Sequence, residues 1–538
     1  MSIILRNGRI VDGSGNPWYH ADIAIEKGRI VKIRSKINGS ADRELDVNNL
    51  ILSPGFIDVH SHTDFILPFY SKMDSFIQQG ITTCVVGMCG QSLAPIHPEK
   101  VNEFRRMMGN SIPIFNEIDI KWNTFKEYIT EMEKLRIPAN LIFFVGFENL
   151  RIAGGPGFNR EEPTKDELET MKNYVREAME AGAFGMSTGL IYAPQVFAKT
   201  EEIIELAKIV AKYNGFYFSH IRGEGATLIE AVKEFVEIME KSKCIGGQIA
   251  HHKVAGIKFW GKSIETLKLI EDANEHGLNI SCDSYPYNRA MTGLSTTLPP
   301  WAREGNDREI LMRLSDPGIR EKIKTECMKH SDEWENIIYE SGFESLFLAV
   351  VNTEKWKPFR GKNIAEITKI KDKTDDWEIY FEILIDEKLG VMVTIKDMGE
   401  EDILRILASR YQMVGTDGAA IPVNPRLGSY HPRFFGTYPR ILGKYVREKK
   451  ILTLENAIRK MTSFPAQRLG LRDRGLIREG LWADIVVFNP DTIIDKSTFI
   501  EPHQVPEGIK YVIVNGVIVV ENKKQYRKYP GKVLKRYS

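Results

Sequence analysis

The sequence contains little of what several large classes of protein are built from. Its five cysteines are an odd number and too few to form a disulfide scaffold in a chain of 538 residues. No apolar run approaches the roughly eighteen residues that a membrane helix needs, and the N-terminus lacks the long apolar centre of a signal peptide. We therefore expect a soluble, cytoplasmic protein.

An excess of charge of one sign is also absent, because 73 basic residues balance 72 acidic ones and leave a formal net charge of +1. Such a chain has no basic stripe for nucleic acid and no polybasic surface for a membrane. Its 43% hydrophobic residues are typical of a globular protein, and its length predicts two or three structural units. We expect its partners to be small molecules, whereas the sequence leaves its oligomeric state open.

Both ends of the chain are predicted to consist of short β-strands. β-Forming residues cluster there between turn signals such as Asn7-Gly8 and Asn515-Gly516. We interpret the two ends as one small β-sandwich domain assembled from residues 1–50 and 471–538.

The middle of the chain, residues 51–470, alternates short apolar runs with amphipathic helical stretches. This alternation is typical of an α/β fold in which helices cover a parallel sheet. Eight runs, with no Gly-x-Gly-x-x-Gly opening the first helix, favour a closed (β/α)8 TIM-like barrel, and an open sheet is the alternative. The eight runs are residues 51–59, 81–87, 140–146, 183–187, 216–219, 247–250, 279–282 and 412–415.

One connection is much longer than the others, since residues 288–411 separate the seventh and eighth runs. Connections between elements usually have only a few residues. The segment contains Trp334, Trp356 and Trp377 together with its own helix and strand patterns, which predicts an inserted subdomain at about residues 296–396. Its place between two barrel strands makes it a candidate lid over the mouth of the barrel.

Residues able to bind a metal gather where the predicted strands end, which is where a barrel of this type carries its chemistry. His60 and His62 are two residues apart, a spacing that turns both side chains of a strand to one face. The ends of four further runs supply Cys89, His220, His251 and Asp417. Imidazole, thiolate and carboxylate groups are the ligands of Zn²⁺ or a similar metal. Cys84 lies inside a buried run, so it is not preferred. Adjacent strand residues face opposite sides, so only one of His251 and His252 can point inward, and the motif match given below favours His251.

These segments resemble the motifs of the amidohydrolase superfamily and, more specifically, of its D-aminoacylase family. Residues 53–62 (SPGFIDVHSH) resemble the first-strand motif of the superfamily. Eight further segments resemble motifs of the D-aminoacylase family. They are GMCG at 87–90, GMSTGLIY at 185–192, SHIR at 219–222, HHK at 251–253, DSYPY at 283–287, GTDG at 415–418, HPR at 431–433 and GLWAD at 480–484. The resemblance extends from residue 3 to about residue 533 and is weakest in the inserted region.

The resemblance implies a zinc-dependent hydrolase that cleaves N-acyl-D-amino acids to a carboxylate and a free D-amino acid. In this family the residues matching Cys89, His220 and His251 hold one zinc ion firmly, and those matching His60, His62 and Asp417 form a second, weaker site. Asp417 would act first as general base and then as general acid. A D-specific dipeptidase or another amide hydrolase of the superfamily is the alternative, and a non-catalytic binding barrel is a third hypothesis.

Three residues are candidates for binding the α-carboxylate of the substrate, which needs fixed cations and donors. Lys253 follows His251 by two residues and points the same way if the strand geometry continues. Tyr285 and Arg433 match substrate contacts of the family.

Ser187 and Tyr192 are further candidates for contact with the substrate. Ser187 also fits a Gly-x-Ser-x-Gly nucleophile motif, so a serine hydrolase is a competing hypothesis. We favour a place on the barrel floor or against the substrate, because the metal interpretation already uses the histidines that follow it. Phe147 stands where the family usually has histidine, and this departure affects the expected substrate more than the chemistry.

Overall fold

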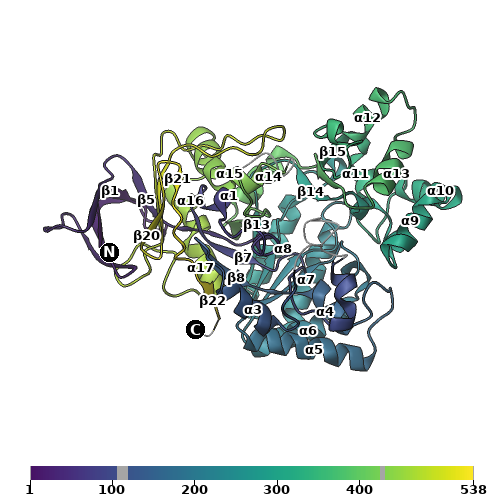
Figure 1. Cartoon of the computed structure of the whole chain (residues 1–538), viewed down its shortest axis with the longest axis horizontal. Helices are drawn as coiled ribbons and strands as arrows, with labels where there is room; N and C mark the ends of the chain where they lie inside the picture. The colour runs from purple at the N-terminus through teal and green to yellow at the C-terminus, as the bar shows by residue number, and fades with distance from the viewer. Residues whose placement is uncertain (1, 106–118, 424–429, 537–538) are drawn as a thin grey trace.

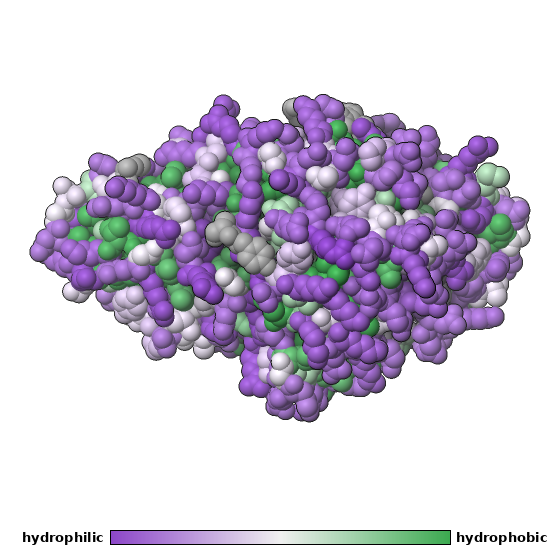
Figure 2. Space-filling model, turned by 90° about the horizontal axis from the view of Figure 1, so that it is seen from below, coloured by the Kyte–Doolittle hydropathy of each residue, from purple (hydrophilic) through white to green (hydrophobic). Residues whose placement is uncertain are grey.

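The computed structural model describes residues 2–105, 119–423 and 430–536. Figure 1 shows strands from both chain ends at one side, an α/β part in the middle, and a largely helical part at the other side. None of the helices in the described ranges has the length and apolar character that a transmembrane segment requires. On the face that Figure 2 shows, hydrophilic residues predominate and the apolar ones lie in small separate groups.

The central part has a strand at each of the eight predicted positions, and neighbouring strands are parallel. One set pairs in the order β8-β7-β6, and the other in the order β17-β13-β12-β11-β10-β9. β8 is followed at once by β9 (Val145–Gly146), which pairs with β10, so the two sets are continuous in the chain. The mixed α/β architecture is thereby confirmed. The eight strands are β6 (Phe56–Asp58), β7 (Ile81–Val86), β8 (Asn140–Phe143), β10 (Gly185–Gly189), β11 (Phe216–His220), β12 (Gly246–Ile249), β13 (Ile280–Ser284) and β17 (Gln412–Val414).

The segments that follow β6 and β17 lie against each other. The amide of Asp417 donates a hydrogen bond to the carbonyl of His60 (2.8 Å), and the amide of His62 donates one to the carbonyl of Gly418 (2.7 Å). Ser61 and Gly418 form a parallel bridge at the same place. These bonds bring residues more than 350 positions apart in the sequence to one point.

Amphipathic helices pack against the strands and bury one face each. α5 (Lys165–Glu180) begins at a capping box in which Thr164 and Glu167 exchange hydrogen bonds, and its buried side includes Met171 and Val175. The same arrangement of a buried and an exposed side is repeated in α6 (Thr200–Lys212), α7 (Leu228–Ser242) and α8 (Ser263–Glu275).

The strands of the two chain ends pair with one another in a nine-stranded sheet. Antiparallel pairing of β5 (Ile51–Pro54) with β18 (Ile485–Phe488) joins the two ends. The prediction of one barrel strand at residues 51–59 is therefore wrong, because β5 belongs to this sheet and only β6 pairs with β7. The chain changes sheets at Gly55, where a Cβ atom would lie 2.2 Å from the hydroxyl of Thr82.

The long connection between β13 and β17 forms elements of its own. β14 (Ala290–Gly293), β15 (Leu346–Val350) and β16 (Met392–Ile395) make an antiparallel sheet, and helices from α9 (Asp307–Ser315) to α13 (Asp376–Asp386) pack with it. Its core contains the three predicted tryptophans and is separate from the core of the central part. Figure 1 places this inserted segment at the side opposite the terminal sheet.

Buried carboxyl groups lie where the inserted segment meets loops of the central α/β part. Glu340 accepts a hydrogen bond from the amide of Ala226 (3.2 Å), and the carbonyl of Asp397 accepts one from the indole of Trp260 (2.8 Å). Burial raises the pKa of Glu340 to about 7 and the pKa of Asp397 to about 8. The side-chain oxygen Oδ1 of Asp397 has no hydrogen-bond partner among the described residues.

Replacing Asp397 with asparagine is expected to flatten the dependence of stability on pH. An unfolded aspartate ionises near pH 4, whereas folded Asp397 keeps its proton to about pH 8. The folded state therefore binds more protons in that window, and the free energy of unfolding falls as pH rises, by at most about 1.4 kcal/mol per pH unit. Urea unfolding at pH 5 and pH 8 would measure the difference between Asp397→Asn and the wild type. The exposed Asp332→Asn is the control, and parallel pH curves for Asp397→Asn and wild type would contradict the prediction.

Candidate metal and substrate site

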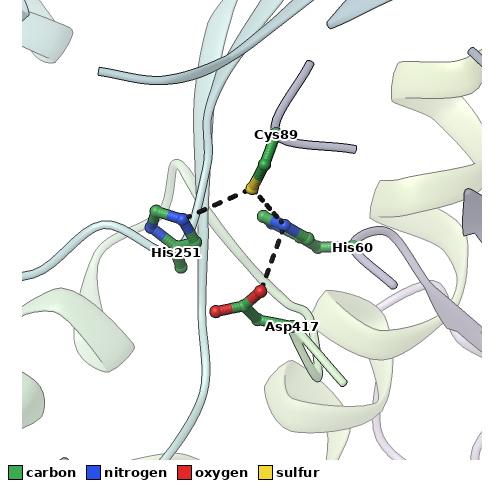
Figure 3. A group of neighbouring side chains, drawn as sticks. All are labelled: His60, Cys89, His251 and Asp417. Atoms are coloured by element: carbon green, nitrogen blue, oxygen red, sulfur yellow. Dashed lines mark hydrogen bonds and ion pairs between the residues drawn. The ribbon is translucent and has the colours of Figure 1, made fainter. Parts of the chain in front are cut away.

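Four predicted ligands from four different strand ends converge on one point (Figure 3). The donor atoms of His60, Cys89, His251 and Asp417 all lie within 4.8 Å of one another. The sulfur of Cys89 is 3.3 Å from Nε2 of His60 and 3.7 Å from Nε2 of His251. Nε2 of His60 is in turn 3.5 Å from Oδ1 of Asp417. All four residues are buried, so a cation placed among them would be shielded from solvent.

The two remaining predicted ligands border the same point. His220 packs edge-on against His251, with ring centroids 4.2 Å apart, and belongs with it to a second group of candidate donors. Neither ring nitrogen of His220 has a hydrogen-bond partner among the described residues, although the side chain is buried. His62 places Nε2 at 3.2 Å from Oδ1 of Asp417. A buried imidazole without a partner is costly, and a metal ion would satisfy it.

The charges in the cluster suit a metal cation. Burial opposes ionisation of the Cys89 thiol, but His60, His220 and His251 hold its pKa well below the usual range. Burial also opposes ionisation of Asp417, and Arg433 with the histidines holds the pKa of that carboxyl well below normal. Ionised Cys89 and Asp417 together with imidazole nitrogens are the donor set that Zn²⁺ prefers. The residues present therefore fit this metal.

Two acidic residues with no predicted role orient the histidines. Oδ1 of Asp283 contacts Nδ1 of His60 at 3.1 Å and accepts the amide of His251 at 2.9 Å. Oε1 of Glu224 lies 2.9 Å from Nδ1 of His251. Carboxylates in such places fix the ring orientation of metal-binding histidines. Asp283 falls within the DSYPY motif, whereas nothing in the sequence around Glu224 singles it out.

Three of the donor residues have left-handed backbone torsions, which residues with side chains rarely adopt. The φ angles are 53° at Cys89, 32° at His251 and 47° at Asp417. Strain of this kind persists where the surrounding structure holds it, and it gathers at functional sites.

The predicted substrate residues divide into two groups. Nη1 of Arg433 lies 2.9 Å from Oδ2 of Asp417, and its guanidinium is stacked 4.7 Å above the ring of Tyr285. Tyr192 packs against His220, with ring centroids 5.0 Å apart. Lys253 instead pairs with Glu224 at 2.5 Å and contacts Nδ1 of His251 at 2.7 Å. The structure thus places Lys253 against His251, one of the predicted metal ligands, and outside the residues that line the cavity.

Ser187 is fully buried on β10 and does not line the cavity beside the donor cluster, which is described in the next paragraph. Its hydroxyl accepts the amide of Gly90 at 3.0 Å and donates to the carbonyl of Gly87, on either side of Cys89. Within the described residues, its hydroxyl makes no hydrogen bond to a histidine that could serve as its base. This position does not suit the nucleophile of a serine hydrolase.

A cavity of about 240 Å³ opens beside the cluster, between loops of the central α/β part and the inserted segment. His62, Cys89, Asp417 and Arg433 lie on its floor side, and Arg303 enters from the inserted segment. Glu148 and Asp307 add two carboxyl groups to the lining. Many of the remaining lining residues are apolar or uncharged, among them Phe65, Ile66, Phe158, Met291, Thr296, Ala419, Ile421 and Phe434. Its size and mixed lining are those of a small-molecule site.

Comparison with known proteins gives the family of the chain. The model of the amidohydrolase family matches residues 43–310 and 401–520, which together leave out most of the inserted segment. The chain belongs to the amidohydrolase family. Among curated relatives, the N-acyl-D-glutamate deacylase of Alcaligenes xylosoxydans xylosoxydans is 33% identical over 100% of this chain and 97% of its own. The D-aminoacylase of the same organism is 32% identical over 99% of this chain and 97% of its own.

Solved structures of similar proteins agree with this family. The N-acyl-D-glutamate deacylase of Bordetella bronchiseptica, complexed with zinc and a phosphonate inhibitor, is 30% identical and superposes with a TM-score of 0.81 over 99% of both chains. A D-aminoacylase described as having a binuclear metal centre is 31% identical, with a TM-score of 0.80 over 99% of both chains.

This amidohydrolase carries a cation in its cavity that the sequence motifs did not reveal. Arg303 follows β14 in the inserted segment and is 7% exposed. Nη1 of Arg303 donates to the carbonyl of Ile191 at 2.7 Å, whereas Nε has no partner among the described residues. Burial lowers the pKa of Arg303 to about 10, which leaves it charged at neutral pH. No motif signals the residue, because it lies in the region of weakest resemblance.

The predicted departure at Phe147 has a structural counterpart. Phe147 begins α4 (Phe147–Gly154) and is fully buried in the main core. The next residue, Glu148, lines the cavity. Its Oε2 accepts hydrogen bonds from the side-chain Nε2 atoms of Gln91 and Gln195, each at 3.0 Å. The third strand end of this amidohydrolase thus presents a carboxylate to the cavity.

Proposed function

We propose that the chain hydrolyses the amide bond of N-acyl-D-amino acids with the help of zinc, releasing a carboxylate and a free D-amino acid. The observation that carries the proposal is the convergence of Cys89, His251, His60 and Asp417 beside Arg433, at a cavity that Cys89, Asp417 and Arg433 line. Full-length relatives named as N-acyl-D-glutamate deacylase and D-aminoacylase support it.

Six residues would hold the metal. Cys89, His220 and His251 would form the tight site, and His60, His62 and Asp417 a weaker one beside it. The sulfur of Cys89 lies 3.7 Å from Nε2 of His251 and 3.3 Å from Nε2 of His60. Zinc bound there lowers the pKa of water and polarises an amide carbonyl. Glu224 and Asp283 would hold His251 and His60 in the orientation that leaves their Nε2 atoms toward the metal.

Asp417 would move the proton that the reaction requires. Its low pKa keeps the carboxylate ionised at neutral pH, so it can accept a proton from the attacking water. It would then give that proton to the nitrogen of the scissile amide, which leaves as the amine of the D-amino acid. His62 and Arg433, on either side of the carboxylate, limit its orientation.

The substrate would be oriented by two arginines of the cavity. Arg433, stacked on Tyr285, lines the cavity, and its guanidinium can bind the α-carboxylate there while Nη1 stays paired with Asp417. Arg303 would then face the side chain, and a buried cation favours a carboxylate there. We infer a preference for substrates with an acidic side chain, and Tyr192, which also lines the cavity, would contact the substrate between the two.

Arg303→Met is expected to change side-chain preference rather than chemistry. Loss of a charged hydrogen-bond partner lowers kcat/KM for N-acetyl-D-glutamate by about 10- to 100-fold. The value for N-acetyl-D-leucine is expected to change less than about threefold. Arg320→Met, in the same inserted segment but away from the cavity, is the matched control. Equal losses on both substrates would contradict this role for Arg303.

The eight parallel strands are proposed to close into a (β/α)8 barrel. Continuity of β8 with β9 and the hydrogen bonds between residues 60–62 and 417–418 support closure. We place the barrel at residues 55–470, with the inserted segment at about 296–396 and a small β domain from residues 1–54 and 471–538. The inserted segment would serve as a wall or lid of the substrate cavity.

Hydrolysis assays on the purified protein test the function directly. The panel contains N-acetyl-D-glutamate, N-acetyl-D-leucine, their L-enantiomers and dipeptides with a D-residue, each measured before and after exhaustive chelation and after zinc is restored. We expect turnover of N-acetyl-D-amino acids that chelation abolishes and zinc restores. Turnover that survives metal removal would exclude the metal mechanism, and preference for the dipeptides would favour the dipeptidase alternative.

A further inference from the structure

The turn that presents Cys89 is strained. Gly87, Cys89 and Gly90 have φ angles of 79°, 53° and 76°, so three of four consecutive residues are left-handed. Cys89 has a side chain and adopts this region only at a cost. The preferences of its own residues therefore do not explain why the turn holds this shape.

Side chains from neighbouring segments bind the backbone of the turn from both sides. Ser187, on β10, accepts the amide of Gly90 at 3.0 Å and donates to the carbonyl of Gly87. Nε2 of Gln195 donates to the carbonyl of Cys89 at 3.1 Å, and its Oε1 accepts the amide of Gly189 at 2.6 Å. The backbone groups before, at and after Cys89 are thus all held by buried side chains.

Glu148 completes this arrangement from α4. Its backbone amide donates to the carbonyl of Gly90 at 2.8 Å, and its Oε2 accepts Nε2 of Gln195 at 3.0 Å. The second bond fixes which end of the Gln195 amide faces Cys89, because a carboxylate accepts only from the amino end. Ser187 and Gln195 are fully buried and Glu148 is 2% exposed, so water does not compete freely for these bonds.

Gly90 makes room for the glutamine. A Cβ atom at this position would lie 1.9 Å from Oε1 of Gln195, closer than any real contact. The turn and the glutamine amide are therefore fitted to each other, and neither could keep its place if a larger residue replaced Gly90.

We propose that Gln195, Ser187 and Glu148 are positioning residues for the Cys89 thiolate, and we call them the thiolate clamp. The proposal rests on the metal site of the proposed function. The sulfur of Cys89 lies 3.3 Å from Nε2 of His60 and 3.7 Å from Nε2 of His251. A small rotation of the turn would change the distance of the Cys89 sulfur from both histidines at once. The clamp would therefore affect how tightly the protein retains metal as well as its activity.

Cobalt-substituted protein tests the clamp, because a thiolate bound to Co²⁺ gives a charge-transfer absorption band that reports on the sulfur–metal contact. Gln195→Met keeps the volume of the side chain but removes its hydrogen bonds. We expect Gln195→Met and Ser187→Ala to shift or weaken this band and to release metal to a competing chelator about 10- to 100-fold more readily than wild type.

Gln412→Met is the matched control. Gln412 is a fully buried glutamine at the start of β17 whose Nε2 donates to the hydroxyl of Ser284 at 3.0 Å. Its hydrogen bonds within the described residues do not reach the Cys89 turn. We expect it to lower the melting temperature like Gln195→Met but to leave the charge-transfer band and metal retention unchanged. Thermal unfolding of the metal-free proteins separates this general loss of stability from the specific effect.

The outcomes distinguish the clamp from the metal site itself. A wild-type cobalt protein without a thiolate band would overturn the assignment of Cys89 as ligand and, with it, the clamp. A wild-type band that stays unchanged in Gln195→Met and Ser187→Ala would overturn the clamp alone. Equal loss of metal in Gln412→Met would show that any buried defect has this effect and would also overturn it.

Discussion

Asp417→Asn is expected to lower kcat about a thousandfold while the tight zinc ion stays bound. Asparagine keeps the size of the side chain but cannot accept a proton at neutral pH, and a positioned general base typically contributes about 100- to 10,000-fold. The ligands proposed for the tight site, Cys89, His220 and His251, are unchanged in this variant. Steady-state kinetics on an N-acetyl-D-amino acid and zinc content per chain measure the two quantities.

A second buried aspartate supplies the control for this substitution. Asp495 pairs with Arg440 at 3.1 Å and accepts a hydrogen bond from Tyr287 at 3.2 Å, much as Asp417 pairs with Arg433, but it does not line the cavity. Asp495→Asn is expected to lose stability without a comparable fall in kcat. An Asp417→Asn enzyme with more than about a tenth of wild-type kcat would exclude Asp417 as the general base.

Cys89→Ala is expected to abolish stoichiometric zinc binding and, with it, activity. The thiolate would be the one soft ligand of the cluster. Losing a residue that only hydrogen-bonds a metal ligand typically lowers metal affinity roughly 10- to 100-fold, and losing the ligand itself lowers it more. We therefore expect metal affinity to fall at least about a hundredfold. Zinc content after dialysis measures this loss, and hydrolysis at saturating zinc shows how much activity returns.

The neighbouring thiol of Cys84 gives a close comparison. It lies inside β7 and is fully buried, and burial raises its pKa well above the usual range, so it stays a neutral apolar side chain. Cys84→Ala is expected to leave zinc content and activity near those of the wild type. Full zinc retention in Cys89→Ala would show that the ligand set has been assigned to the wrong thiol.

The central strands and the donor residues could be predicted from the sequence because both depend on local patterns. Apolar runs between amphipathic stretches indicate buried parallel strands, and polar residues just after such runs must meet at one edge. This logic located His60, Cys89, His220, His251 and Asp417 without knowledge of how the strands pair. The change of sheet at Gly55 escaped it, since residues 51–59 are apolar in both sheets and only the pairing partners differ.

The roles of Lys253 and Ser187 could not be derived in the same way. Lys253 was expected to follow strand alternation, but β12 ends at Ile249 and His251 has a left-handed backbone, so the alternation does not continue. Its ammonium lies against Glu224, a residue without a sequence signal. Ser187 contacts the turn of another strand, and such contacts between distant segments are set by packing.

Pairing of β5 with β18 has a consequence for the order in which the protein assembles. β5 lies directly before the strand that leads to His60 and His62, and its partner lies more than 430 residues later in the chain. During synthesis, this end of the first strand stays without that partner until almost the whole polypeptide has left the ribosome. Completion of the terminal sheet is therefore a late event, and a chain cut short before residue 485 would lack the support for the first histidine pair. The proposed metal site would therefore gain this part of its support only near the end of translation, whereas β5 can pair with β1 much earlier.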